Sequence, residues 1–187
     1  MDESKKITIS GTNNKYAIKN LINNRKENEI KKRVVSQKWN FNIECFETAN
    51  QLCVLKNIDN NIDDIHSLND ELTKVIIQEI YKKISGYKQQ DLLKKHYNVE
   101  KFITFDNVIK KLIESNLKCR YCDCDMLVLY DISRELKQWS IDRIDNDEGH
   151  NNDNFHLACF DCNIKRRRRS DEKFLFTKKL NLIKQDY

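Results

Sequence analysis

The sequence has no proline and only three glycines among its 187 residues, whereas Asn, Lys and Ile are abundant. This composition is as typical of A/T-rich coding as of a structural requirement, so richness in asparagine is not taken as a sign of function. No run approaches the roughly 20 apolar residues that a membrane helix needs. The N-terminus, Met-Asp-Glu-Ser-Lys-Lys, also lacks the apolar segment of a secretion signal. We therefore expect an intracellular protein, in the cytoplasm or nucleus, that is not membrane-bound.

The chain length suits one ordinary domain, or one domain joined to a small module that needs a metal for stability. We favour the second arrangement. Charged residues make up 34% of the sequence and the net charge is +5. This balance suits a soluble protein with a mild preference for polyanions.

The seven cysteines indicate metal binding rather than disulfides, because their number is odd and four of them form two Cys-x-x-Cys pairs. The pairs Cys119/Cys122 and Cys159/Cys162 can supply four sulfurs to one tetrahedral Zn(II). Cys124 is an alternative ligand to Cys122. The two remaining thiols are expected to be buried, and they are Cys45 and Cys53.

The first hundred residues carry few motifs. Residues 1–40 form a basic Asn/Lys-rich tail or loose helix, where a protein partner could bind. Residues 41–103 are predicted to be mainly helical and have no assigned function. Within them, a helix is expected from Ser67 to Gly86 and a shorter one over 91–97.

The second half predicts a mixed α and β module over residues 104–175. Thr104 should cap a helix that leads into Cys119 and packs beneath the module. Alternating apolar and polar residues predict strands over 139–145 and 155–158, joined by a loop around Gly149. A helix should follow over 159–169, and residues 176–187 should form a last helix packing back on the body. The predicted fold class is α+β, with a zinc-stabilised ββα-metal module.

This order of elements resembles the HNH endonuclease family, in the zinc-stapled variety of many phage and large DNA virus proteins. The resemblance covers about residues 104–175 and consists of Cys-x-x-Cys, an Asp-containing strand, Gly-x(4)-Asn and Cys-x-x-Cys-Asn. It implies a divalent-metal-dependent nuclease that hydrolyses DNA phosphodiester bonds, located in a virus factory or virion if the protein is viral.

The resemblance also implies roles for individual residues. Asp142 and Asn163 become ligands of a catalytic Mg(II) or Mn(II), which prefers such oxygen donors. Asn154 takes an architectural position that ties the loop to the first strand. The family's usual general base, a histidine, is replaced by Arg143, which stays protonated and can only bind or stabilise the phosphate.

Another group must then activate the water, and the nearby candidates are His150, His156 and Asp145. We favour His150, whose ordinary pKa of about 6.5 suits a base. The alternative interpretation is that His150 is an exposed loop residue without a catalytic role. Asp147 and Glu148 are interpreted as an acidic, solvated turn.

Five cations follow Asn163, and they are Lys165, Arg166, Arg167, Arg168 and Arg169. Consecutive helical residues lie about 100° apart, so two or three of the five could contact phosphates while the others face water. We expect double-stranded DNA as the partner. The alternative functions are a catalytically inactive zinc-binding HNH-like module, acting in nucleic-acid binding or protein assembly, and a zinc module that binds only proteins.

Overall fold

The structure is a computed structural model that describes residues 30–180. Most of the predicted tail over 1–40 and the last part of the predicted helix over 176–187 lie outside these residues. The chain divides into two units, Met1–Lys31 and Lys32–Tyr187, of which the second is compact over its described residues. Every described helix and strand belongs to the second unit.

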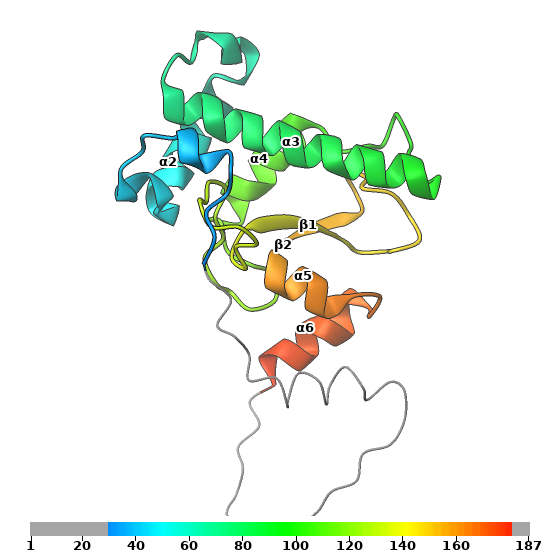
Figure 1. Ribbon diagram of the computed structural model, residues 1–187. Coiled ribbons are helices and arrows are strands. Elements are labelled where there is room, and N and C mark those ends of the chain that lie inside the picture. The colour runs from blue at the N-terminus through cyan, green and yellow to red at the C-terminus, as the bar shows by residue number, and fades with distance from the viewer. Residues whose placement is uncertain (1–29, 181–187) are drawn as a thin grey trace, which may run out of the picture. The chain divides into compact units, whose positions relative to one another are not determined.

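The second unit combines helices with a two-stranded antiparallel sheet, which agrees with the α+β prediction (Figure 1). In chain order, the elements are η2 (Ser36–Lys38), η3 (Ile43–Phe46), α2 (Thr48–Asn60), η4 (Ile62–Ser67), α3 (Glu71–Lys94), α4 (Phe105–Glu114), β1 (Trp139–Arg143), β2 (Phe155–Cys159), α5 (Phe160–Arg166) and α6 (Asp171–Lys179). Among the described residues, no helix is long and apolar enough to cross a membrane.

Helix α3 replaces the two helices predicted between residues 67 and 97. It is capped by Asp70, which accepts the backbone N–H of Thr73 at 2.9 Å, whereas Ser67 ends η4. Gly86 was predicted to end the first helix, but it lies inside α3. A glycine costs a helix interior only about 1 kcal/mol relative to alanine. Burial of the apolar face of α3 outweighs that cost, so the helix continues.

One hydrophobic core joins the helices to the sheet, with members from Leu55 in α2 to Phe174 in α6. Thr104 caps α4 as predicted, by accepting the N–H of Asn107 at 3.2 Å. Four of the α4 side chains are buried, namely Phe105, Val108, Ile109 and Leu112. Helix α4 also reaches the sheet directly, because Lys111 Nζ donates to the carbonyl of Phe155 at 2.8 Å. This bond connects α4 to the second strand of the hairpin.

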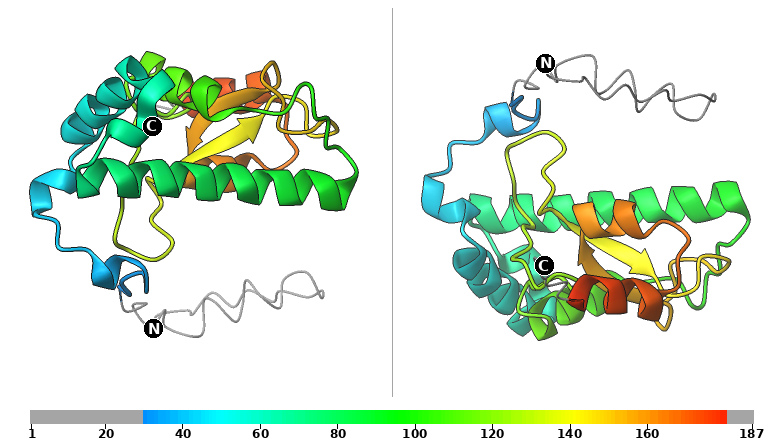
Figure 2. Two further views of the ribbon diagram at one scale, coloured as in Figure 1. Left: turned by 90° about the horizontal axis from the view of Figure 1, so that it is seen from above. Right: turned by 90° about the horizontal axis from the view of Figure 1, so that it is seen from below.

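The two strands pair so that Trp139 faces Cys159 and Asp142 faces His156. Strand β1 is two residues shorter than predicted, since it ends at Arg143. The hairpin lies between α3 on one side and α5 on the other (Figures 1 and 2). This placement brings residues of α3 close to the predicted catalytic loop.

The C-terminal helices also differ from their predicted bounds. Helix α5 ends at Arg166 rather than Arg169, because Arg167 adopts a left-handed φ of 55° that helical residues avoid. Helix α6 then begins at Asp171, before the predicted start at residue 176, and its Phe174 is buried.

The two isolated cysteines are less buried than expected. Cys45 is half-buried, and Cys53 is exposed on α2. The prediction was wrong for Cys53 because α2 turns that position away from its buried face, which carries Leu55 and Ile58.

Candidate metal centre and adjoining cavity

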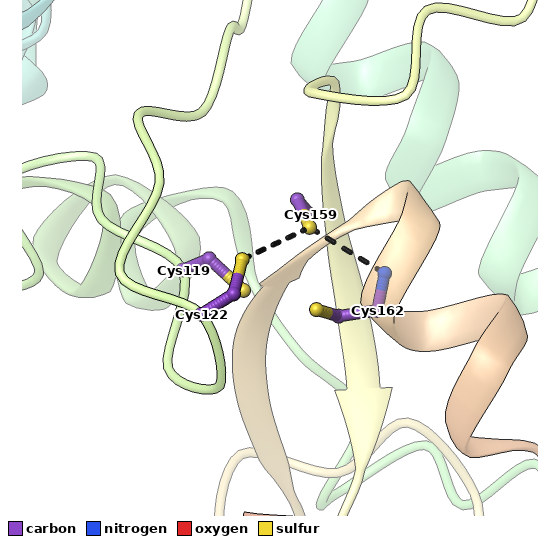
Figure 3. A group of neighbouring side chains, drawn as sticks. All are labelled: Cys119, Cys122, Cys159 and Cys162. Atoms are coloured by element: carbon purple, nitrogen blue, oxygen red, sulfur yellow. Dashed lines mark hydrogen bonds between the residues drawn. The ribbon is translucent and has the colours of Figure 1, made fainter. Parts of the chain in front are cut away.

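The four paired cysteines meet in space, as their spacing predicted (Figure 3). Cys119 and Cys122 come from the loop after α4, Cys159 ends β2, and Cys162 lies in the first turn of α5. Their sulfur atoms all lie within 4.8 Å of one another. Four sulfurs bound to zinc at about 2.3 Å in a tetrahedron lie about 3.8 Å apart. The separation between the sulfurs of Cys122 and Cys159 is 3.8 Å. The donor set therefore fits a zinc ion.

The environment of this cluster allows neutral thiols, or thiolates only when a cation neutralises them. The pKa of the Cys119 thiol is raised to about 12, mainly by its hydrogen bond with Cys159. The pKa of Cys162 is likewise raised to about 12, mainly by burial. Several thiolates cannot share such a site unless a divalent cation neutralises them. Cys124 is not a member of this group. Its carbonyl instead accepts the N–H of Cys119 at 2.9 Å, which shapes the turn that holds the first pair.

A cavity of about 420 Å³ lies along β1, and its lining includes Phe160 and Asn163, which follow Cys159 and Cys162 in the sequence. Four of the predicted catalytic residues line it, namely Asp142, Arg143, His150 and Asn163. Helix α3 supplies a second set of lining residues, which includes Lys83, Tyr87 and Gln90. His156 lines a different cavity, with Lys111 and Arg120. Of the two histidines, only His150 shares this cavity with Asp142, Arg143 and Asn163.

Asp142 is buried, with 4% of its surface exposed, and both of its carboxylate oxygens already have partners. One oxygen accepts from Arg166 at 2.7 Å and the other from the hydroxyl of Tyr121 at 2.5 Å. Burial raises the pKa of Asp142, while these two donors act in the opposite direction. The Tyr121 hydroxyl also lies 2.6 Å from a carboxylate oxygen of Asp171. The motif gave no sign of Tyr121 or Asp171, because neither belongs to the matched pattern.

Asn163 is held by its amide nitrogen, which donates to the hydroxyl of Ser140 and to the carbonyl of Ile141 at 3.1 and 3.0 Å. Its amide oxygen remains available as an acceptor or a metal ligand. A carboxylate can accept several contacts at once, so Asp142 can keep its two partners and still bind a cation. The structure brings Asp142 and Asn163 to the same cavity, and each carries an oxygen of the kind that Mg(II) prefers.

Asn154 and Arg143 shape the loop between the strands. The Asn154 side chain accepts the N–H of Asp145 at 2.8 Å and donates to the carbonyls of Asp145 and Gly149, both at 3.0 Å. These bonds cross-link the loop itself, because Asp145 and Gly149 both lie between β1 and β2. Arg143 donates to the carbonyl of Glu148 at 2.8 Å, which holds its guanidinium beside the cavity.

His150 is 4% exposed, so it is not the solvent-exposed loop residue of the alternative interpretation. Its backbone N–H donates to Asp91, and its Nδ1 lies 2.7 Å from the same carboxylate. Its ring stacks on Tyr87, with the ring centres 4.6 Å apart. Burial lowers the pKa of His150, Asp91 raises it, and Arg143 and Lys94 lower it further. His150 is therefore held mainly as the neutral imidazole, the form that a general base requires.

Asp91 belongs to a row of polar residues that repeats every four positions along α3. Glu79 pairs with Arg33 at 2.6 Å, and Lys83 donates to the carbonyl of Trp139. Tyr87 accepts the N–H of Ile141 at 3.0 Å, and Asp91 binds His150. Residues four apart lie on the same side of a helix, so this row faces β1 and its loop. The four-residue spacing is present in the sequence, but the sequence alone does not show that these side chains contact β1 and its loop.

In the structure, the run of five cations consists of one buried and four exposed side chains. Arg166 is fully buried and also donates to the carbonyls of Arg143 and Ile144, so its guanidinium is not available to a phosphate. The burial of Arg166 follows from the geometry of α5, where it lies one turn beyond Cys162 and on the face toward β1. The other four cations are exposed, and they are Lys165, Arg167, Arg168 and Arg169.

No protein family, curated protein or solved structure matches this chain. Any functional assignment therefore depends on the order of the motifs and on the geometry of the site.

Proposed function

We propose that this chain is a divalent-metal-dependent phosphodiesterase that cleaves nucleic acid, with double-stranded DNA as its substrate. The observation that carries the proposal is the cavity on β1, where a buried histidine, an arginine and two oxygen-bearing residues meet. The order of motifs that resembles HNH endonucleases supports the same function. The exposed arginines after α5 offer sequence-independent contacts to the phosphate backbone.

In this proposal, His150 takes a proton from the attacking water, and Arg143 binds a phosphate oxygen. Asp142 and Asn163 would hold the divalent metal, which supplies polarisation of the phosphate and stabilisation of negative charge when bound. Lys83 lies in the same cavity, and burial lowers its pKa to about 7. Near neutral pH it therefore adds only a partial positive charge for the substrate.

Incubation of supercoiled plasmid with the purified protein and Mg(II) or Mn(II) tests this function. We expect nicking that His150→Gln lowers by about 10²-fold or more, the usual contribution of a general base. His66→Gln is the matched control, because His66 is exposed on η4 and lies outside the cavity. Zinc content should stay unchanged in both variants, and the melting temperature should stay unchanged in His66→Gln.

A catalytically inactive nucleic-acid-binding module is the second candidate. The observation that favours it is the pairing of Asp142 with Arg166 at 2.7 Å, together with arginine at the usual base position. Binding of DNA without nicking, for either metal and for duplex, single-stranded and branched substrates, would establish this candidate and reject the phosphodiesterase.

A further inference from the structure

Asp91 is a buried carboxylate that binds two N–H groups of one residue. It is 0% exposed and lies in the last turn of α3. One of its oxygens accepts the backbone N–H of His150 at 2.7 Å, and the other lies 2.7 Å from Nδ1 of the same residue. A buried carboxylate near a helix C-terminus is unfavourable, because it meets the negative end of the helix dipole and loses hydration. The two charge-assisted hydrogen bonds to His150 offset that cost.

This contact determines which nitrogen of His150 carries the proton. An ionised carboxylate can only accept hydrogen bonds, so Nδ1 of the neutral ring must be the donor. The other nitrogen, Nε2, is then left with a lone pair that can accept a proton. Stacking on Tyr87 restricts rotation of the ring, and His150 lines the cavity that also holds Arg143 and Asn163.

We propose that Asp91 is a positioning residue for phosphodiester cleavage, which holds His150 as the Nδ1–H tautomer so that Nε2 receives the proton of the attacking water. This inference rests on the proposed function. In the step itself, the water oxygen bonds to phosphorus while one of its O–H bonds breaks and the proton moves to Nε2. The bond from phosphorus to the leaving oxygen breaks, and that oxygen takes a proton from solvent. Asp91 stabilises the imidazolium that forms.

The loop that carries His150 has other anchors, so the role of Asp91 can be separated from simple loop docking. The carbonyl of His150 accepts the N–H of Ile103 at 3.0 Å, and Asn154 binds the carbonyl of Gly149 at 3.0 Å. These bonds do not involve Asp91. Loss of the Asp91 charge should therefore change the tautomer of the His150 ring more than the backbone conformation of the loop.

The informative variant is Asp91→Asn, which keeps the size of the side chain but provides one acceptor oxygen in place of two. If that oxygen keeps the backbone N–H of His150, the new amide group donates to Nδ1. The ring proton must then move to Nε2, and the base is lost. Glu71→Gln is the matched control, because it removes one charge from an exposed position of the same helix.

The test combines imidazole nitrogen NMR of the zinc-loaded protein with plasmid nicking kinetics. We expect Nδ1 of His150 to be protonated in the unmodified protein, and Nε2 to be protonated in the Asp91→Asn variant. Its kcat should fall by about 10²- to 10⁴-fold, the range for loss of a general base, with KM nearly unchanged. Glu71→Gln should match the unmodified protein in both measurements.

The NMR measurement also separates this inference from the proposed function. An Nδ1–H tautomer in a protein that nicks no substrate would support the role of Asp91 in holding the ring and would reject the phosphodiesterase. An Nε2–H tautomer in the unmodified protein overturns the inference, as does an Asp91→Asn variant with unchanged tautomer and rate. If that variant does not fold, the tautomer of the unmodified protein decides.

Discussion

Arg166 and His150 show how burial decides the role of a single residue. Both stand in polar parts of the sequence, and both have at most 4% of their surface exposed. Arg166 binds the buried carboxylate of Asp142 at 2.7 Å, and His150 binds that of Asp91. Each pair places a charged or polar group where water cannot replace its partner, so removal of either partner should be costly.

Replacement of Arg166 by alanine should lower the free energy of unfolding by about 3–5 kcal/mol, because it leaves Asp142 buried without its ionic partner. The control is Arg168→Ala. Arg168 pairs with Asp147, but both side chains are about 80% exposed, and solvent screens that pair. Urea unfolding measures both variants. Equal losses for the two arginines would show that Arg166 is not a buried partner in solution.

The pH dependence of stability should report the environment of His150. Burial lowers its pKa in the folded protein, Asp91 raises it, and Arg143 and Lys94 lower it further. The unfolded chain therefore binds more protons between that lowered pKa and about 6.5. This contribution to stability is complete above about pH 6.5 and is lost as the pH falls through the folded pKa.

Urea unfolding at several pH values between 5 and 8 checks this prediction. The His150→Gln variant should lose part of the decrease in stability at acid pH, whereas His66→Gln should retain it. An identical pH profile for His150→Gln and the unmodified protein would contradict a lowered pKa.

At the scale of elements, α3 connects the helical half of the protein to the hairpin. Its polar row reaches β1 through Tyr87 and reaches the loop through Asp91. Gly149 allows the loop to approach the end of α3 closely. A Cβ at that position would lie 2.5 Å from the carbonyl oxygen of His96 and 3.0 Å from a carboxylate oxygen of Asp91. The close fit between loop and helix therefore requires glycine.

Gly149→Ala should destabilise the protein by about 1–3 kcal/mol, the usual cost of an overpacked site, because the backbone of His96 cannot rotate away. Gly86→Ala provides the opposite control. Nothing lies within 4 Å of a Cβ at Gly86, and alanine favours a helix interior by about 1 kcal/mol. Chemical denaturation should therefore show changes of opposite sign, and a stabilising Gly149→Ala would contradict the docking of the loop on α3.

The sequence predicted these elements unevenly. The caps and stripes of α4 and the alternation of β1 were readable because they depend on neighbouring residues, such as Thr104 and Asn107. The predicted helix end at Gly86 was wrong. Burial of the apolar face of α3 outweighs the cost of a glycine inside a helix, which is about 1 kcal/mol. The partner of Asp91 could not be predicted, since it lies 59 residues away and depends on how α3 packs on the hairpin.

Across the whole molecule, the cysteine cluster joins two distant segments of the chain. It links the loop after α4 to the junction where β2 ends and α5 begins. Strand β1 and helix α5 also line the cavity. A metal bound by the four sulfurs should therefore hold the hairpin and α5 in the arrangement that forms this cavity.

We expect one zinc ion per chain by elemental analysis, and chelation should unfold the hairpin and α5. Structural zinc sites supply on the order of 10 kcal/mol of apparent binding free energy to folding. Cys119→Ser should lose the zinc and lower the melting temperature, whereas the exposed Cys53→Ser should do neither. Zinc loss with full retention of the fold would refute a structural role for the metal.

The residue pattern predicted the cluster of four paired cysteines, the helical and strand periodicities and the order of motifs that resembles an HNH endonuclease. These features depend on spacing along the chain, which local geometry converts directly into structure. The burial of Arg166 against Asp142 and the contact of Asp91 with His150 beside the cavity could be found only from the folded chain. These contacts join elements packed from distant parts of the chain, so the shared core rather than any local pattern sets which residues meet.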